Sequence, residues 1–210
     1  MADQKPEKRE RRSQKDRSES MQRKVLDATL RCIGERGYIG VSLQDIADAA
    51  GVSRGAITHH YSSKIELTSS AIQHFVHWRY EKVHRAFEGK TDLDLRGRLD
   101  VLWGEFQEIF PIMFELIVAL RSDKELLALY KRSAKTRIEE VITGYDEFFP
   151  ELSGLRVPGV VIAVMAAFYR GVYIESVSRD PAYIEEMKQV FQDMLMKYLA
   201  LDDRQPGAAA

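Results

Sequence analysis

Hydrophobic residues recur at intervals of three and four along almost the whole chain after Ser20, and the two-residue alternation of a half-buried strand is nearly absent. This periodicity predicts an all-α protein. The first predicted helix begins near Ser20 and carries an apolar stripe that includes Leu26 and Leu30. It is expected to end at Gly34 or Gly37, where glycine can adopt a left-handed cap.

Two short helices are predicted next, each preceded by a serine. Ser42 precedes a helix that extends to about Ala50, and Ser53 precedes one over 54–60. Serine at these positions caps the free amides of a first helical turn. Gly51 separates the two helices, and this arrangement predicts a helix-turn-helix.

The apolar residues inside this motif fit the same geometry. Ala47 is the small residue where the two helices cross, Ile57 fills the angle between them, and Ile46, Ala50 and Val52 complete an apolar wedge. Small and branched residues are needed there because the helices approach closely at a steep angle.

A long helix is predicted to connect this region to the rest of the chain. Ser63 and Glu66 have the spacing of a capping box, and helical periodicity then continues to a break at Gly89. The apolar stripe of the following helix is expected to be interrupted by Pro111.

The remaining helices are also predicted from caps and prolines. Ser122 to Glu125 is expected to cap a helix whose apolar positions extend to Tyr145. Pro158 and Pro181 occupy first turns of the last two helices, with Asp180 as the cap of the second.

The stretch GVSLQDIADAAGVSRGAITHHYSSKIEL over 40–67 resembles the DNA-binding core of the TetR (tetracycline repressor-like) family of bacterial transcription regulators. The likeness of motif covers roughly residues 22–70, and only helix count, length and hydrophobic layout resemble the family beyond it. Where the family commonly has aromatic residues after Ile57, this chain has Thr58 and His59.

The resemblance implies a ligand-responsive regulator, most simply a repressor. It would bind a palindromic operator in double-stranded DNA as a homodimer and be released by a small-molecule inducer. In the family the last two helices, here about 157–178 and 181–199, pair with their counterparts in a four-helix interface. Periodicity alone also permits that their apolar faces form only intrachain core.

The second helix of a helix-turn-helix enters the major groove by its N-terminal end. Arg54 either grips guanine with two hydrogen bonds or holds a phosphate. Lys64 is expected to hold a phosphate, and Tyr61 is expected to pack its ring between the helices. The predicted DNA-binding residues are Ser42, Ser53, Arg54, Gly55, Thr58, His59, Tyr61 and Lys64.

Aromatic and methionine residues in the second half are candidates for an apolar ligand cavity. About a third of the aromatic and methionine candidates in 103–114 and 168–173 are expected to face a cavity, and the others to be core. The candidate ligand-binding residues are His74, Trp78, Trp103, Phe106, Phe110, Met113, Phe114, Arg121, Phe168, Tyr169 and Tyr173, with Arg170 as a further polar candidate. They suggest an apolar or aromatic metabolite, with or without a carboxylate.

Charge is unevenly distributed although the formal net charge is −1. Residues 1–90 hold 17 basic and 12 acidic side chains, whereas residues 91–210 hold 14 and 20. The basic arm at the start either touches DNA or only aids solubility. With one cysteine, no apolar leader and no run of about 20 apolar residues, a cytoplasmic protein without a membrane span is expected.

Other chemistry is not favoured by the sequence. The stretch Gly51 to Gly55 fits the G-x-S-x-G pattern, but a helix rather than a strand precedes it, so a catalytic Ser53 is not expected. His74, His77 and His84 lie too far from a patterned acid or thiol to predict a metal site. No cofactor is predicted, and the alternative function is a small helical carrier protein or enzyme in which the helix-turn-helix is only packing.

The predicted organisation has a disordered basic arm over 1–19, a DNA-binding domain over 20–67, a ligand-binding and dimerisation domain over 68–203, and a disordered tail over 204–210. A helix over 63–88 links the two domains.

Overall fold

The computed structural model describes residues 14–90, 92–134, 147–152 and 154–202, and these parts are helical without any strand. The all-α prediction is therefore confirmed. The predicted arm up to residue 13, the helical positions from 135 to 146 and the predicted tail lie outside the described residues. The elements are α1 (Gln14–Arg36), α2 (Leu43–Ala50), α3 (Arg54–His60), α4 (Lys64–Phe87), α5 (Leu95–Ser122), α6 (Lys124–Ala134), the 3-10 turn η2 (Pro150–Leu152), α8 (Pro158–Ser176) and α9 (Pro181–Asp202).

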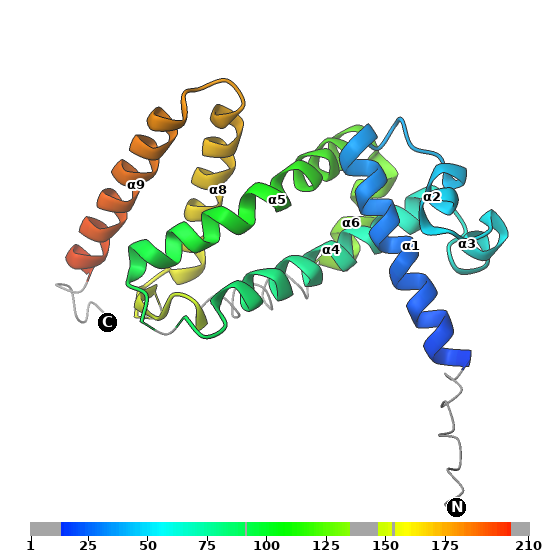
Figure 1. Ribbon diagram of the computed structural model, residues 1–210, viewed down its shortest axis with the longest axis horizontal. Coiled ribbons are helices and arrows are strands. Elements are labelled where there is room, and N and C mark those ends of the chain that lie inside the picture. The colour runs from blue at the N-terminus through cyan, green and yellow to red at the C-terminus, as the bar shows by residue number, and fades with distance from the viewer. Residues whose placement is uncertain (1–13, 91, 135–146, 153, 203–210) are drawn as a thin grey trace, which may run out of the picture.

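The long helices α4 and α5 run side by side in opposite directions and form the middle of the molecule (Figure 1). At one end α1 crosses them, and α2 and α3 lie beyond it. At the other end α8 and α9 form an antiparallel pair that packs on α5. The helix-turn-helix and the α8–α9 pair therefore lie at opposite ends.

Buried side chains form two clusters that match this division. The smaller one joins α1, α2 and α3 and contains Val25, Ile46, Ile57 and Leu67, each with no exposed surface. The larger one extends through α4, α5, α6, α8 and α9. The small cluster gives the helix-turn-helix its own core, held to the rest mainly through α1 and α4.

The first helix is longer than the sequence indicated. It begins at Gln14 rather than near Ser20 and ends at Arg36. Of the two predicted end points, Gly34 lies inside the helix, whereas Gly37 has a φ of 71° and donates its amide to the carbonyl of Ile33. The left-handed cap is therefore Gly37.

Pro111 does not break α5, which continues through it from Leu95 to Ser122. The predicted interruption is wrong. Pro111 lies on the exposed side of the helix, while Phe110 and Met113 beside it are buried. A proline inside a helix costs about 3 kcal/mol, and burying side chains of this size on both sides contributes more.

Two predicted caps differ in detail. Ser63 accepts the amide of Glu66, but the Glu66 carboxylate accepts from the amide and hydroxyl of Ser62, so the reciprocal capping box does not form. At α6 the cap is Asp123, whose carboxylate accepts two amides, and not Ser122. In the first case the donor, and in the second the acceptor, lies one residue away from its predicted position.

The starts of the last two helices agree with the prediction. Pro158 occupies the first turn of α8, and the Asp180 carboxylate accepts the amide of Ala182 at the start of α9.

Candidate nucleic-acid interface

The first helix of the motif is held by caps at both of its ends. Ser42 Oγ accepts the amide of Asp45 at 3.2 Å, and the Asp45 carboxylate accepts the amide of Ser42 at 2.7 Å. These bonds to Ser42, and then the Arg36 guanidinium, lower the pKa of Asp45 to about 2. Gly51 ends the helix with a φ of 67°, a conformation that side chains with a Cβ rarely adopt.

The second helix is fixed to the first through one buried residue. Ile57 is the buried side chain of α3 and lies in the small cluster with Ile46 and Ala47, all three with no exposed surface. The packing roles predicted for these residues are confirmed. With Ile57 turned inward, the opposite face of a seven-residue helix is turned outward.

The outward face carries the predicted base-contacting residues. Arg54, Gly55, Thr58 and His59 are exposed. Ser53 Oγ accepts the amide of Ala56 at 3.1 Å and so caps the N-terminal end of α3, where Arg54 and Gly55 lie. Arg54 forms no ion pair within the part of the chain that the structure describes, so its guanidinium is available to a ligand outside the chain.

The other end of α3 is fastened to the protein. The His60 ring lies 2.9 Å from the Gln22 amide nitrogen of α1. The Tyr61 side chain is buried in the small cluster, as its predicted packing required. Tyr61 therefore contributes to the position of α3 from within the domain core.

Lys64 has a protein partner that the sequence did not indicate. Its ammonium donates to the backbone carbonyl of Tyr38 at 2.5 Å and lies 4.3 Å from the centre of the Tyr38 ring. Burial lowers the pKa of Lys64. If Lys64 contacts a phosphate, its ammonium therefore binds both the phosphate and the loop between α1 and α2.

Tyr38 also joins the two domains, a contact that sequence reasoning missed. Its hydroxyl donates to the Asp123 carboxylate at 2.9 Å across 85 residues of chain. The same carboxylate caps α6, so one acid contacts both the loop before α2 and the first turn of α6. No local sequence pattern predicts this pairing, because it depends on how α1 crosses α5.

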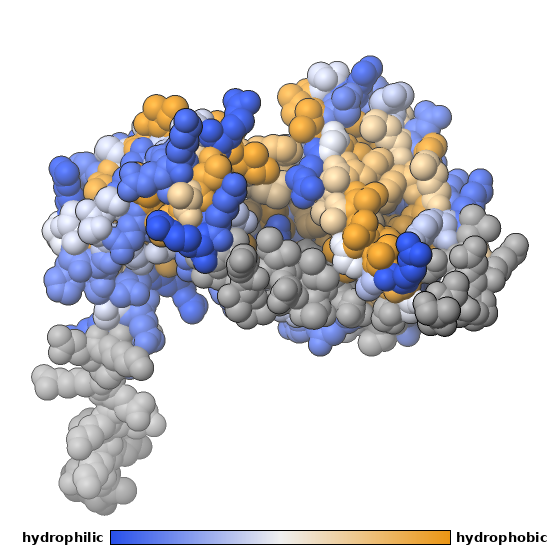
Figure 2. All heavy atoms as spheres, turned by 180° about the vertical axis from the view of Figure 1, so that it is seen from behind, coloured by the Kyte–Doolittle hydropathy of each residue, from blue (hydrophilic) through white to orange (hydrophobic). Residues whose placement is uncertain are grey.

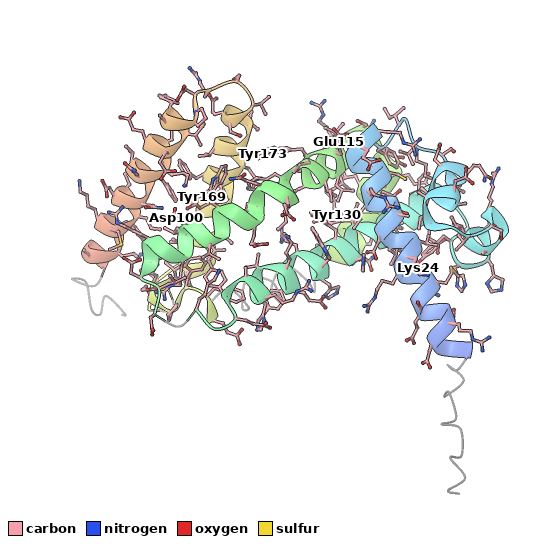
Figure 3. The ribbon with its side chains drawn as sticks, viewed as in Figure 1. Lys24, Asp100, Glu115, Tyr130, Tyr169 and Tyr173 are labelled. Carbon is pink, nitrogen blue, oxygen red and sulfur yellow. The ribbon has the colours of Figure 1, made fainter. Side chains whose placement is uncertain are left out.

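Seven of the predicted ligand residues form a continuous aromatic cluster between α5, α8 and α9. Trp103 and Phe106 contact Tyr169, and Phe110 and Phe114 contact Tyr173 with ring centres 5.3 and 5.7 Å apart. Figure 3 shows Tyr169 and Tyr173 on the side of α8 that faces α5. Phe168 stacks on Phe191 of α9 at 3.9 Å and continues the cluster to that helix.

The other candidates lie elsewhere. His74 contacts Asp27 of α1 at 2.6 Å, which places it at the junction of α4 with α1. Trp78 stacks on Phe75 of its own helix, Arg121 is exposed, and Met113 is buried core.

A hollow of about 390 Å³ lies at the end of the molecule where α4 ends and α5 begins. Its walls include His84, Phe87, Arg98 and Phe148, and none of the predicted ligand residues. The described residues contain no group of three histidine, cysteine, aspartate or glutamate side chains suited to a metal ion.

The last two helices expose apolar stripes on their outer faces. The exposed side chains recur at intervals of three and four or their sums, as they do where helices pack in bundles. Figure 2 shows apolar atoms gathered over this end of the molecule. The residues of these stripes are Val160, Val164 and Ile174 on α8, and Tyr183, Val190, Met194 and Tyr198 on α9; Met196 of α9 is exposed outside the stripe.

α8 is also long and apolar enough to cross a membrane by length and composition alone. Its inner face is occupied, since Met165, Tyr169 and Val172 are buried. It also carries Arg170 in its middle.

A capped helix, a glycine turn and a short second helix that presents polar residues outward define a helix-turn-helix protein of the kind that reads DNA. Comparison with known proteins agrees. Residues 25–71 match the family model described as bacterial regulatory proteins, tetR family. The matched stretch contains α2 and α3, so this part of the chain is similar to the regulators of that family.

Among curated proteins, the chain is 34% identical over 124 residues to the HTH-type transcriptional regulator CymR of Pseudomonas putida, covering 55% of this chain and 59% of CymR. It is 23% identical over 202 residues to the regulator TtgR of Pseudomonas putida, covering 91% and 86%. The aligned regions span about three fifths of CymR and of ArpR, another Pseudomonas putida regulator.

Among solved structures, a transcriptional regulator of Rhodococcus sp. Rha1 superposes with a TM-score of 0.63 at 19% identity, covering 84% of this chain and 96% of that one. A regulator from Pseudomonas aeruginosa PAO1 superposes with a TM-score of 0.60 at 19% identity, covering 90% and 97%. At these identities the likeness shows a shared fold.

Proposed function

We propose that this chain is a homodimeric, ligand-responsive transcription regulator, most simply a repressor, that binds a palindromic operator in the cytoplasm and catalyses no reaction. The observation that carries the proposal is the presentation of α3. Ile57 anchors the helix from behind, and Arg54 and Thr58 are exposed on its outer face. This is the arrangement that places a recognition helix in the major groove.

The outer faces of α8 and α9 supply the dimer contact in this proposal. A second copy of the same chain is the partner that fits, because each copy brings the same two apolar stripes and a twofold axis pairs them into a four-helix bundle. Such a dimer presents two α3 helices, and half-sites about 34 Å apart lie on the same side of the duplex.

The ligand response requires that the C-terminal domain change the position of α3. The Tyr38–Asp123 hydrogen bond is a direct connection between the two domains. A ligand that prefers the dimer geometry unable to bind DNA, with a coupling of about 1 to 3 kcal/mol, changes operator affinity roughly 5- to 150-fold. A similarly folded regulator from Saccharomonospora viridis was solved with choline, which supports a small-molecule site in this fold.

Gel-shift titrations of genomic fragments at several salt concentrations test the proposal. A regulator retains a few fragments in the presence of excess unrelated DNA, and its affinity falls steeply as salt rises. Equal retention of all fragments, or none, would favour the carrier or enzyme alternative.

Replacing Arg54 by Ala should reduce discrimination against single base changes at one operator position by about 1 to 3 kcal/mol, because a bidentate contact to guanine is lost. Arg54→Lys is the matched variant: it should keep the salt dependence of binding and still lose the preference. Competition titrations with operators altered at one base pair measure the base preference and the salt dependence of binding. Identical base preferences in the wild type and both variants would contradict the assignment of Arg54.

Tyr38→Phe should lower the free energy of unfolding by about 1 to 2 kcal/mol, because the Asp123 carboxylate loses a buried hydroxyl donor. It should also speed amide exchange at the starts of α2 and α6, which the bond joins. Tyr80→Phe is the control, since the Tyr80 hydroxyl makes no hydrogen bond within the described parts of the chain. The connection would be refuted if thermal unfolding and amide exchange were the same in the two variants.

A further inference from the structure

Among the residues that the structure describes, Arg79 on α4 and Arg170 on α8 are half-buried cations without an acidic partner. Neither forms an ion pair with any described residue. The Nε atom of Arg79 is buried and has no hydrogen-bond partner; the Nε atom of Arg98 is in the same state, but the guanidinium of Arg98 pairs with Glu151. Buried guanidinium donors are ordinarily satisfied, so an unpartnered one requires an explanation.

The packing of α4 against α5 determines the position of Arg79 along the axis of α5. Lys82 Nζ lies 2.7 Å from Glu108 of α5 and 3.2 Å from Glu105. α4 and α5 run in opposite directions (Figure 1), so Arg79, almost one turn before Lys82, lies level with the turn of α5 that contains Phe110.

The register of α8 on α5 brings Arg170 to the same level. Tyr169 contacts Phe106, and Tyr173 contacts Phe110, with ring centres 6.0 and 5.3 Å apart. Arg170 lies between these two tyrosines in the chain. The positive charge of Arg79 accordingly acts on Arg170, whose pKa is lowered first by burial and then by that charge.

Other cations in the same helices are matched. Every other half-buried or buried lysine or arginine of α4, α5, α8 and α9 has a carboxylate partner. The one further exception is Lys64 at the first turn of α4. The pairs are Lys82 with Glu105 and Glu108, Arg96 with Asp193, Arg98 with Glu151, and Lys188 with Asp100 and Glu185. Arg79 and Arg170 are the exceptions within the described residues.

Two neighbouring like charges without counter-charge reduce the stability of the free protein, and an anion between them removes the repulsion and satisfies the free donors. We propose that Arg79 and Arg170 together bind the carboxylate of a small organic acid whose apolar body packs against the rings of Phe110, Phe114 and Tyr173. This rests on the proposed function, because it names the chemical class of the effector.

The first test needs no ligand. Arg79→Met and Arg170→Met should each leave the melting temperature unchanged or raise it by about 2 to 4 °C, because each removes an unmatched charge and keeps an apolar stem. Arg98→Met is the control and should lower it, because it leaves Glu151 without its partner. Destabilisation of all three proteins to the same extent would overturn the proposal.

The second test uses benzoate, phenylacetate and octanoate at fixed ionic strength, each beside its neutral amide. At least one acid should raise the melting temperature of the wild type by about 2 °C or more and change the fluorescence of Trp78, next to Arg79. The amides should have no effect, and the Arg79→Met/Arg170→Met protein should not respond to the acids. No response to any acid, an equal response to the amides, or an undiminished response in the double variant would overturn the proposal.

These results are independent of the proposed function. Sequence-selective DNA binding is measured without any acid, so its absence contradicts the regulator and leaves the melting experiments valid. Conversely, if the protein selects DNA sequences but does not respond to the acids, only the proposed carboxylate site is contradicted.

Discussion

Replacing Met194 by Glu should convert the protein to a monomer and lower its affinity for a two-site operator by at least about 100-fold. The Met194 side chain is 64% exposed and lies in the stripe that includes Val190 and Tyr198. In a four-helix dimer interface the new carboxylate would be buried opposite apolar side chains without a partner, which is strongly unfavourable. Loss of the second recognition helix then removes an avidity of about 10²- to 10⁴-fold.

Gln189→Glu is the matched control for Met194→Glu. Gln189 is exposed on the polar side of α9 and receives the same change of charge. Light scattering after size exclusion should give a dimer mass for the wild type and Gln189→Glu, and a monomer mass for Met194→Glu. If Met194→Glu remains dimeric and binds the operator like the control, the dimer does not use this face.

Ile57→Ala should abolish specific DNA binding while the C-terminal domain stays folded. Truncating a fully buried isoleucine costs about 2 to 5 kcal/mol, and Ile57 is the buried side chain of α3. The small cluster has few other residues with which to refill the space, so α3 should detach from α2. Amide exchange across 43–67 should increase sharply, and operator affinity should fall more than tenfold in fluorescence anisotropy.

Thr58→Ala separates loss of the fold from loss of a DNA contact. Thr58 is exposed, so its replacement should change the free energy of unfolding by no more than about 0.5 kcal/mol while still altering DNA binding. If Ile57→Ala were as stable as Thr58→Ala and bound DNA normally, α3 would not depend on the small cluster for its position.

The helix-turn-helix was predictable because its signals are local. Ser42, Gly51 and Ser53 act on amides and dihedral angles within a few residues, and Ile57 lies in one buried cluster with Ile46 and Ala47 of the preceding helix. Periodicity likewise predicted most helices, although α1 begins earlier than its apolar stripe indicated. A polar first turn can be helical without contributing to an apolar pattern.

Features that depend on distant packing were not predictable. Pro111 was expected to interrupt an apolar stripe because the sequence does not reveal how firmly α5 is held by buried neighbours on both sides. The Tyr38–Asp123 bond and the nearness of Arg79 to Arg170 arise only when helices far apart in the chain are packed together.

The aromatic candidates form a cluster, but the sequence could not separate their roles, and their contact with a ligand stays a prediction. Tyr169 is fully buried and packs like core, whereas Tyr173 and Phe114 remain partly exposed beside Arg170. Periodicity marks the inner face of a helix without distinguishing close packing from the wall of a binding site.

Selection of bound DNA from a random library by the full chain tests most directly whether two copies of α3 act together. The account predicts enrichment of an inverted repeat whose half-site centres are separated by about 10 base pairs or a multiple of that spacing. It also predicts that Arg54→Ala loses one fixed position in each half. Enrichment of a single unrepeated site, or no enrichment at all, would contradict it.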